Sequence, residues 1–73
     1  MNFFSIQSET ISHIEYDSHK KDLIVYFCNH TEEHFRLVPE STISSWVNSP
    51  HPDSFYSASI KGRYPSVRIQ TEK

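Results

Sequence analysis

The fold is decided by six consecutive apolar residues, Leu23-Ile24-Val25-Tyr26-Phe27-Cys28. A short β-favouring run that is apolar on both faces is typical of a strand in the middle of a sheet. Residues 10–17 and 32–38, on either side, mix apolar and polar residues as strands do. We therefore predict a three-stranded antiparallel β-meander with this run at its centre.

The turn after the central strand can be predicted from the alternation of side chains. A two-residue loop would place Phe27 on the charged face of the third strand, whereas a three-residue loop over residues 28–30 aligns it with Phe35 and Leu37. We predict the three-residue loop. It puts His30 at a position where the backbone is usually left-handed and glycine is common.

A first helix is expected directly after the meander. Pro39 can begin it, because the N–H that proline lacks would have no partner in the first helical turn. Ile43, Trp46 and Val47 then form an apolar stripe at helical spacing, which would lay the helix across the sheet. Trp46 is predicted to anchor the core.

A second short helix follows a proline-rich break. Asp53 or Ser54 can cap it, Tyr56 and Ile60 share one face, and Gly62, the single glycine of the chain, is its stop signal. The alternation after residue 65 fits either a short C-terminal strand or an extended tail. The fold class expected is α+β, with the two helices packed on one face of the meander.

Composition restricts the compartment. The chain has 73 residues, enough for one small domain, and its single cysteine, Cys28, excludes an internal disulfide. It has no run of 18 apolar residues, and its N-terminal segment lacks the basic region of a signal peptide. We expect a soluble cytoplasmic protein that does not associate with membranes.

Charge is distributed unevenly, although the formal net charge is only −2. Residues 1–36 carry three basic and six acidic side chains, a net charge of −3. Residues 54–73 carry four basic side chains and one acidic one, a net charge of +3. This second segment is either a surface that attracts phosphate or an ordinary solvated face.

Several short motifs occur in the order and at the spacing of a known bacterial family. They are Tyr16-Asp17, then Leu23, Val25 and Phe27 before Asn29, then Phe35, Val38-Pro39-Glu40-Ser41, Phe55-Tyr56 and Ile60-Lys61-Gly62-Arg63-Tyr64-Pro65. With them the chain resembles the KTSC domain, a module found at the C-terminus of some lysyl-tRNA synthetases and also alone. The resemblance implies a single domain over residues 1–73 with its core at about 10–68.

The association with the synthetase makes RNA the ligand that the resemblance suggests. The family's central Tyr-x-Tyr pair falls here on Glu33-His34-Phe35, so its first aromatic residue is replaced by a carboxylate. Ser57 and Ala58 stand where the family often has an asparagine and a basic residue.

Catalytic chemistry has little support in the sequence. No histidine pair lies at the i, i+4 spacing of a zinc site on a predicted helix, Cys28 lacks a cysteine partner and an orienting third group, and one glycine cannot build a glycine-rich phosphate loop. The histidines are His13, His19, His30, His34 and His51. We expect a protein that is not an enzyme, with no catalytic residues, metal or cofactor.

Two binding functions remain. In the first, RNA or another single-stranded nucleic acid stacks on aromatic rings and its phosphates contact basic residues. In the second, the same residues dock on a host protein or complex and modulate it, as an accessory or mobile-element-encoded regulator or inhibitor would, since tyrosine and arginine are common interface hot spots. The residues of this predicted patch are Phe35, Tyr56, Lys61, Arg63, Tyr64 and Arg68. The partner's identity and the oligomeric state stay open.

Overall fold

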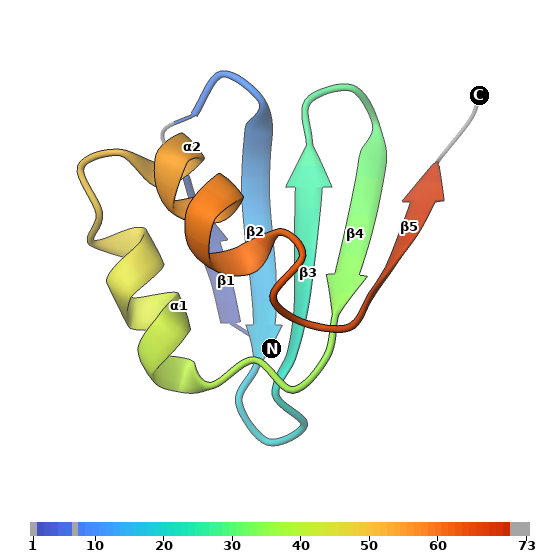
Figure 1. Cartoon of the computed structure of the whole chain (residues 1–73). Helices are drawn as coiled ribbons and strands as arrows, with labels where there is room; N and C mark the ends of the chain where they lie inside the picture. The colour runs from blue at the N-terminus through green and yellow to red at the C-terminus, as the bar shows by residue number, and fades with distance from the viewer. Residues whose placement is uncertain (1, 7, 71–73) are drawn as a thin grey trace.

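The computed structural model describes residues 2–6 and 8–70, in which an antiparallel sheet of five strands is covered by helices on one face (Figure 1). The strands lie side by side in chain order: β1 (Asn2–Ser5), β2 (Ile11–Asp17), β3 (Asp22–Phe27), β4 (Thr31–Phe35) and β5 (Ser66–Gln70). The α+β class and the meander of β2, β3 and β4 are confirmed, and the C-terminal strand forms. Three strands were too few, because β1 was not predicted and β5 completes the sheet.

The helices form one short layer on the sheet (Figure 1). Helix α1 (Glu40–Val47) begins after Pro39, whose backbone is still extended, so the helix starts one residue later than proline at its first position would imply. Helix α2 (Pro52–Phe55) continues into the π-helical turn η1 (Tyr56–Ile60), and Pro52 itself occupies the start of α2. Gly62 follows with φ 76°, which confirms it as the stop signal.

The turn between β3 and β4 has the predicted length. Leu23 lies opposite Phe35 and Val25 opposite Glu33, so residues 28–30 form the loop. His30 has φ 69°, the left-handed conformation expected at this position.

The expectation that Leu37 continues the apolar face of β4 is wrong. Leu37 has φ 61° and is exposed. The chain leaves the sheet after Phe35, where the N–H of Arg36 bonds to the carbonyl of Pro65 and the N–H of Val38 to that of Lys21.

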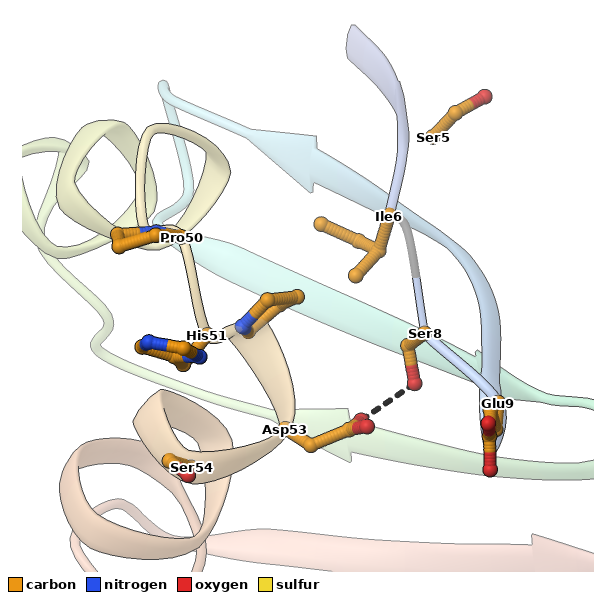
Figure 2. Close-up of a pocket in the computed structure, with 9 residues that line it drawn as sticks. Ser5, Ile6, Ser8, Glu9, Pro50, His51, Asp53 and Ser54 are labelled. Atoms are coloured by element: carbon orange, nitrogen blue, oxygen red, sulfur yellow. Dashed lines mark hydrogen bonds between the residues drawn. The ribbon is translucent and has the colours of Figure 1, made fainter.

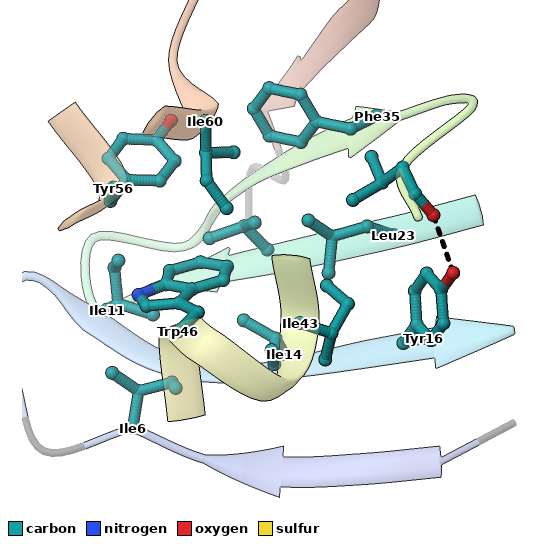
Figure 3. Packing of buried hydrophobic residues seen from close by; sticks show 12 residues of the cluster. Ile6, Ile11, Ile14, Tyr16, Leu23, Phe35, Ile43, Trp46, Tyr56 and Ile60 are labelled. Carbon is teal, nitrogen blue, oxygen red and sulfur yellow. Dashed lines mark hydrogen bonds between the residues drawn. The ribbon is translucent and has the colours of Figure 1, made fainter. Parts of the chain in front are cut away.

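The core lies between the sheet and the helix layer (Figure 3). Trp46 is fully buried, and its Nε1 donates to the carbonyl oxygen of Pro52 at 3.1 Å, which confirms its role as core anchor. The other core side chains are Ile6, Ile11, Ile14, Tyr16, Leu23, Val25, Phe35, Val38, Ile43, Tyr56 and Ile60. Within the described residues, no helix is long and apolar enough to cross a membrane.

Candidate functional site

The predicted patch does not come together as one exposed surface. Phe35 and Tyr56 are buried in the core, where Tyr56 packs edge-on against Phe35 with ring centroids 6.2 Å apart. Two of the three aromatic residues expected to stack on bases are therefore inaccessible, and that part of the prediction is wrong. A small domain needs the aromatic rings between its sheet and its helices for the core, so these rings are not available to a ligand.

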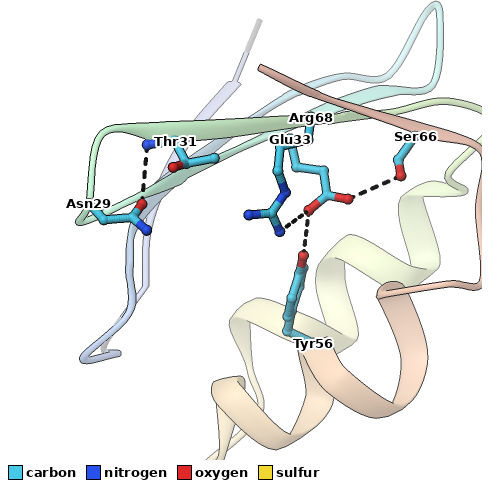
Figure 4. Close-up of polar contacts among 6 residues, drawn as sticks. All are labelled: Asn29, Thr31, Glu33, Tyr56, Ser66 and Arg68. Atoms are coloured by element: carbon cyan, nitrogen blue, oxygen red, sulfur yellow. Dashed lines mark hydrogen bonds and ion pairs between the residues drawn. The ribbon is translucent and has the colours of Figure 1, made fainter. Parts of the chain in front are cut away.

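Glu33 explains the position of two patch residues, Tyr56 and Arg68 (Figure 4). Its Oε1 accepts hydrogen bonds from the hydroxyl of Tyr56 at 3.0 Å and from Nη2 of Arg68 at 3.2 Å, and its Oε2 accepts one from Ser66 Oγ at 3.1 Å. The side chain of Glu33 is only 12% exposed. The positive charge of Arg68 is thus matched within the protein, and its guanidinium carbon also lies 5.6 Å from the centroid of the Phe27 ring.

The hydroxyl of Tyr56 is held in its neutral, donating form. Burial raises the pKa of Tyr56, and the hydrogen bond to Glu33 and the charge of this carboxylate raise it further. The carboxylate of Glu33 thus joins β4, β5 and η1.

The other patch residues lie beside a shallow groove between α1 and η1. Arg63 is exposed and Tyr64 half-buried, with the Tyr64 hydroxyl 3.1 Å from Oγ1 of Thr42. The groove has a volume of about 460 Å³, and its described lining contains one cation and no carboxylate: Ser41, Thr42, Ser45, Phe55, Ser59, Arg63 and Tyr64. Lys61 is exposed but does not line it. The motifs Val38-Pro39-Glu40-Ser41, Phe55-Tyr56 and Ile60-Lys61-Gly62-Arg63-Tyr64-Pro65, which are far apart in the sequence, therefore each contribute to the lining of this groove.

A second hollow, of about 800 Å³, lies between the β1–β2 turn and the start of α2 (Figure 2). Ser8 Oγ donates directly to Asp53 and accepts the N–H groups of Thr10 and Ile11, each at 3.0 Å. His51 also lines the hollow, but its imidazole does not stand between the hydroxyl and the carboxylate. A serine activated by histidine needs that order, so these contacts stabilise a turn.

Metal binding has no candidate in the part of the chain that the structure describes. No three side chains among its histidines, cysteine and carboxylates converge on a point. Cys28 is exposed in the β3–β4 loop.

The sheet has a second face, which none of the helices in the described residues covers (Figure 1). Side chains alternate between the two faces of a strand, and the register of the strands places twelve on this side. We call this surface the outer face; it comprises Phe3, Ser5, His13, Glu15, Asp17, Asp22, Ile24, Tyr26, Glu32, His34, Val67 and Ile69.

An aromatic ladder crosses the outer face from β1 to β3. The rings of Phe3 and His13 are stacked with centroids 4.7 Å apart, and those of His13 and Tyr26 with centroids 4.4 Å apart. The Tyr26 hydroxyl donates to Oε1 of Glu15 at 3.3 Å. Burial raises the pKa of Tyr26, as do the nearby carboxylates of Glu15 and Glu32, so this hydroxyl also stays neutral.

Aliphatic side chains continue the outer face on the other side of the sheet. Val67 is 62% exposed and Ile69 43%, and Phe3 on β1 is 60% exposed. Three of the four exposed large apolar side chains among the described residues thus lie on one face, and Leu37 is the fourth. A hollow of about 330 Å³ beside Val67 and Ile69 also touches Ile24.

The outer face was not predicted from the sequence, although one signal for it was present. In the run of residues 23–28, Leu23 and Val25 alternate with Ile24 and Tyr26, so a helix layer on one side leaves the second pair uncovered. The run was interpreted as the central strand of a meander with helices on one face, and no role was assigned to the apolar side chains of the other face. Phe3 gave no signal because β1 was not predicted.

Comparison with known proteins identifies the fold. The family model of the KTSC domain matches residues 7–64. The crystal structure of a KTSC domain protein from Yersinia pestis superposes with a TM-score of 0.86, at 22% sequence identity, over 93% of this chain and 96% of that chain. No curated protein matches the chain.

Proposed function

The chain belongs to the KTSC domain family, and we propose that it is a small non-enzymatic module that docks on another protein through the outer face of its sheet. The observation that carries this proposal is the gathering of Phe3, Val67 and Ile69 on one uncovered face. An antiparallel sheet with helices on one side usually presents polar side chains on the other. Exposed apolar groups that gather on one face are typical of interaction sites.

The energetics favour a complex that needs polar contacts as well as apolar ones. Complete burial of a fully exposed apolar side chain contributes about 1.5–3 kcal/mol. Phe3, Val67 and Ile69 are 60%, 62% and 43% exposed, so together they offer roughly 2.5–5 kcal/mol. Association costs about 4–15 kcal/mol in lost translational and rotational freedom of the two partners. The aromatic ladder lowers part of this cost, because rings that are already stacked lose little further freedom on binding.

The absence of catalysis is part of the proposal. It is supported by the direct contact between Ser8 and Asp53 and by the exposed, loop position of Cys28. A docking module needs a rigid surface, which the hydrogen-bonded sheet supplies.

Nucleic acid binding is a second candidate, favoured by the groove between α1 and η1. Arg63 lines it together with hydroxyl groups and no carboxylate, and Lys61 is exposed on the same segment. These residues suit contacts to phosphate and sugar, and the half-buried ring of Tyr64 offers one edge for a base. The candidate ranks second because Phe35 and Tyr56 are buried.

Two double variants separate the candidates. Val67→Thr with Ile69→Thr reduces the apolar area of the outer face while keeping β-branched residues in β5. Lys61→Ala with Arg63→Ala removes the two exposed cations of the segment that borders the groove and serves as the matched control. Each is used as bait in a lysate of the native host, with and without nuclease.

Docking through the outer face predicts capture of a discrete protein that survives nuclease and is lost in the β5 variant only. Capture that disappears with nuclease and with the Lys61→Ala, Arg63→Ala variant would instead favour nucleic acid. Phosphate contacts would also make binding fall steeply with salt, whereas a largely apolar interface depends on salt weakly.

A further inference from the structure

We infer that the protein segment that docks on the outer face is basic and places arginine side chains against the aromatic ladder. This inference rests on the docking function proposed above and specifies the chemistry of the partner. The outer face carries the carboxylates of Glu15, Asp17, Asp22 and Glu32, whereas the only lysine or arginine within the described strands is Arg68, on the helix side.

Within the described residues, the other cations do not lie at the centre of this face. Lys20 and Lys21 lie in the turn beyond the ends of β2 and β3, and Arg36, which follows β4 at the same end of the sheet, lines the hollow beside Val67 and Ile69. Lys61 and Arg63 lie on the helix side. The outer face is therefore acidic around its rings although the C-terminal segment of the chain is basic.

Two carboxylates border the ladder. Glu15 accepts from the hydroxyl of Tyr26 at 3.3 Å, and Glu32 lies directly opposite Tyr26 on β4. Oε1 of Glu32 is 3.2 Å from Nε2 of His34. A carboxylate accepts several hydrogen bonds, so both groups keep capacity for donors from a partner.

Arginine fits this arrangement better than other side chains. Its guanidinium is planar, stacks on aromatic rings and donates in a fork to carboxylates, so one side chain can cover Tyr26 and pair with Glu15 and Glu32 together. A wholly apolar partner would bury both carboxylates without donors, which is costly. Neighbouring apolar residues of the segment would cover Val67 and Ile69.

The carboxylates of the outer face also disfavour two other binding partners, nucleic acid and a second copy of this chain. Nucleic acid phosphates would meet four carboxylates of their own sign. A second copy of this chain would bring the same acidic face against the first, where like charges repel. A basic segment of another protein is the occupant that the charges and rings both favour.

The test uses synthetic peptides that repeat Arg-Leu-Ser, with peptides that repeat Glu-Leu-Ser as the matched control. Amide chemical shifts of the full, isotope-labelled chain locate the binding surface. We expect the arginine peptide to shift amides of β2, β3 and β4 around the ladder, and the glutamate peptide to leave them unchanged. Increasing salt should weaken the arginine peptide's binding.

Variants identify the contacts. Glu15→Gln with Glu32→Gln keeps the size of the side chains and an acceptor for Tyr26, and should weaken binding of the arginine peptide about ten-fold, since each partly screened charge pair contributes a few-fold. Lys61→Ala with Arg63→Ala should leave the affinity unchanged.

Several results would overturn the inference. Equal binding of both peptides on the outer face would reject a basic partner while leaving the docking function in place. An arginine peptide that binds in the groove, that is insensitive to Glu15→Gln with Glu32→Gln, or that does not bind would also reject it. Shifts around the ladder that depend on the concentration of the protein alone would identify a second copy as the occupant. The docking function itself stands or falls separately, by the Val67→Thr, Ile69→Thr capture experiment.

Discussion

Tyr56 donates a hydrogen bond of 3.0 Å to the carboxylate of Glu33, and this contact ties the π-helical turn η1 to strand β4. The ring of Tyr56 was predicted to belong to a binding surface, and a carboxylate such as that of Glu33 is usually exposed to solvent. Both are largely buried, and Arg68 and Ser66 complete the cluster from β5. The helix side of the sheet is therefore closed at this point, and the surface available to a partner lies on the opposite side.

Removing the Tyr56 hydroxyl should destabilise the protein. Tyr56→Phe keeps the ring in the core but takes one donor from the Glu33 carboxylate, and hydrogen bonds to charged groups contribute about 1.5–3 kcal/mol. We expect the free energy of unfolding, measured by urea titration, to fall by this amount. Ser66→Ala, which removes a more exposed donor to Glu33, should cost less. Equal stability of Tyr56→Phe and wild type would show that the contact contributes nothing.

The same residue controls stability in alkali. The pKa of Tyr56 is raised above its ordinary value of 10.0, mainly by burial and then by Glu33. Above pH 10 the unfolded chain loses this proton while the folded chain retains it, so the free energy of unfolding falls as pH rises. The wild type and the Tyr56→Phe variant share the titration of their lysines. In Tyr56→Phe, the free energy of unfolding should therefore fall less steeply above pH 10 than in the wild type. Parallel curves would contradict the raised pKa.

His30 tests the β3–β4 turn. With φ 69° it occupies the left-handed region, where glycine has no steric cost. His30→Gly should raise the free energy of unfolding by about 0.5–1 kcal/mol. His30→Ala, which keeps a Cβ, is the control and should not stabilise. A lower melting temperature for His30→Gly would count against this backbone conformation.

Trp46 tests the core. Its ring is fully buried between helix and sheet, so Trp46→Ala should cost on the order of 3–5 kcal/mol. A domain of this size has a margin of roughly 3–5 kcal/mol, so circular dichroism should show most of the variant unfolded. A folded variant with a native melting temperature would show that Trp46 does not anchor the core.

The parts of the fold that sequence could predict depend on local patterns. The alternation around residues 28–30 determined the register, and the spacing of Ile43 and Trp46 determined which side of α1 is buried. By contrast, β1 is too short to show a pattern of its own and exists through its pairing with β2. Leu37 continued the alternation of β4, but a backbone hydrogen bond from Arg36 to Pro65 diverts the chain before it.

The candidate site was harder to predict for a physical reason. A tyrosine such as Tyr56 suits an interface and a core equally, and the partner that its hydroxyl needs in the core is the distant Glu33. The outer face is assembled from five separate strands, so its ladder of Phe3, His13 and Tyr26 arises only when β1, β2 and β3 pair. Lys61 and Arg63 were correctly expected to be exposed, because they flank the helix stop.

Photocrosslinking in the native host tests the docking function most directly. A photoreactive residue is placed at position 67 on the outer face or, as the matched control, at position 63 beside the groove; both positions are exposed. We predict that position 67 forms a discrete adduct with another protein, that nuclease does not remove it, and that position 63 forms none. Adducts from position 63 alone, or adducts that nuclease removes, would contradict docking through the outer face.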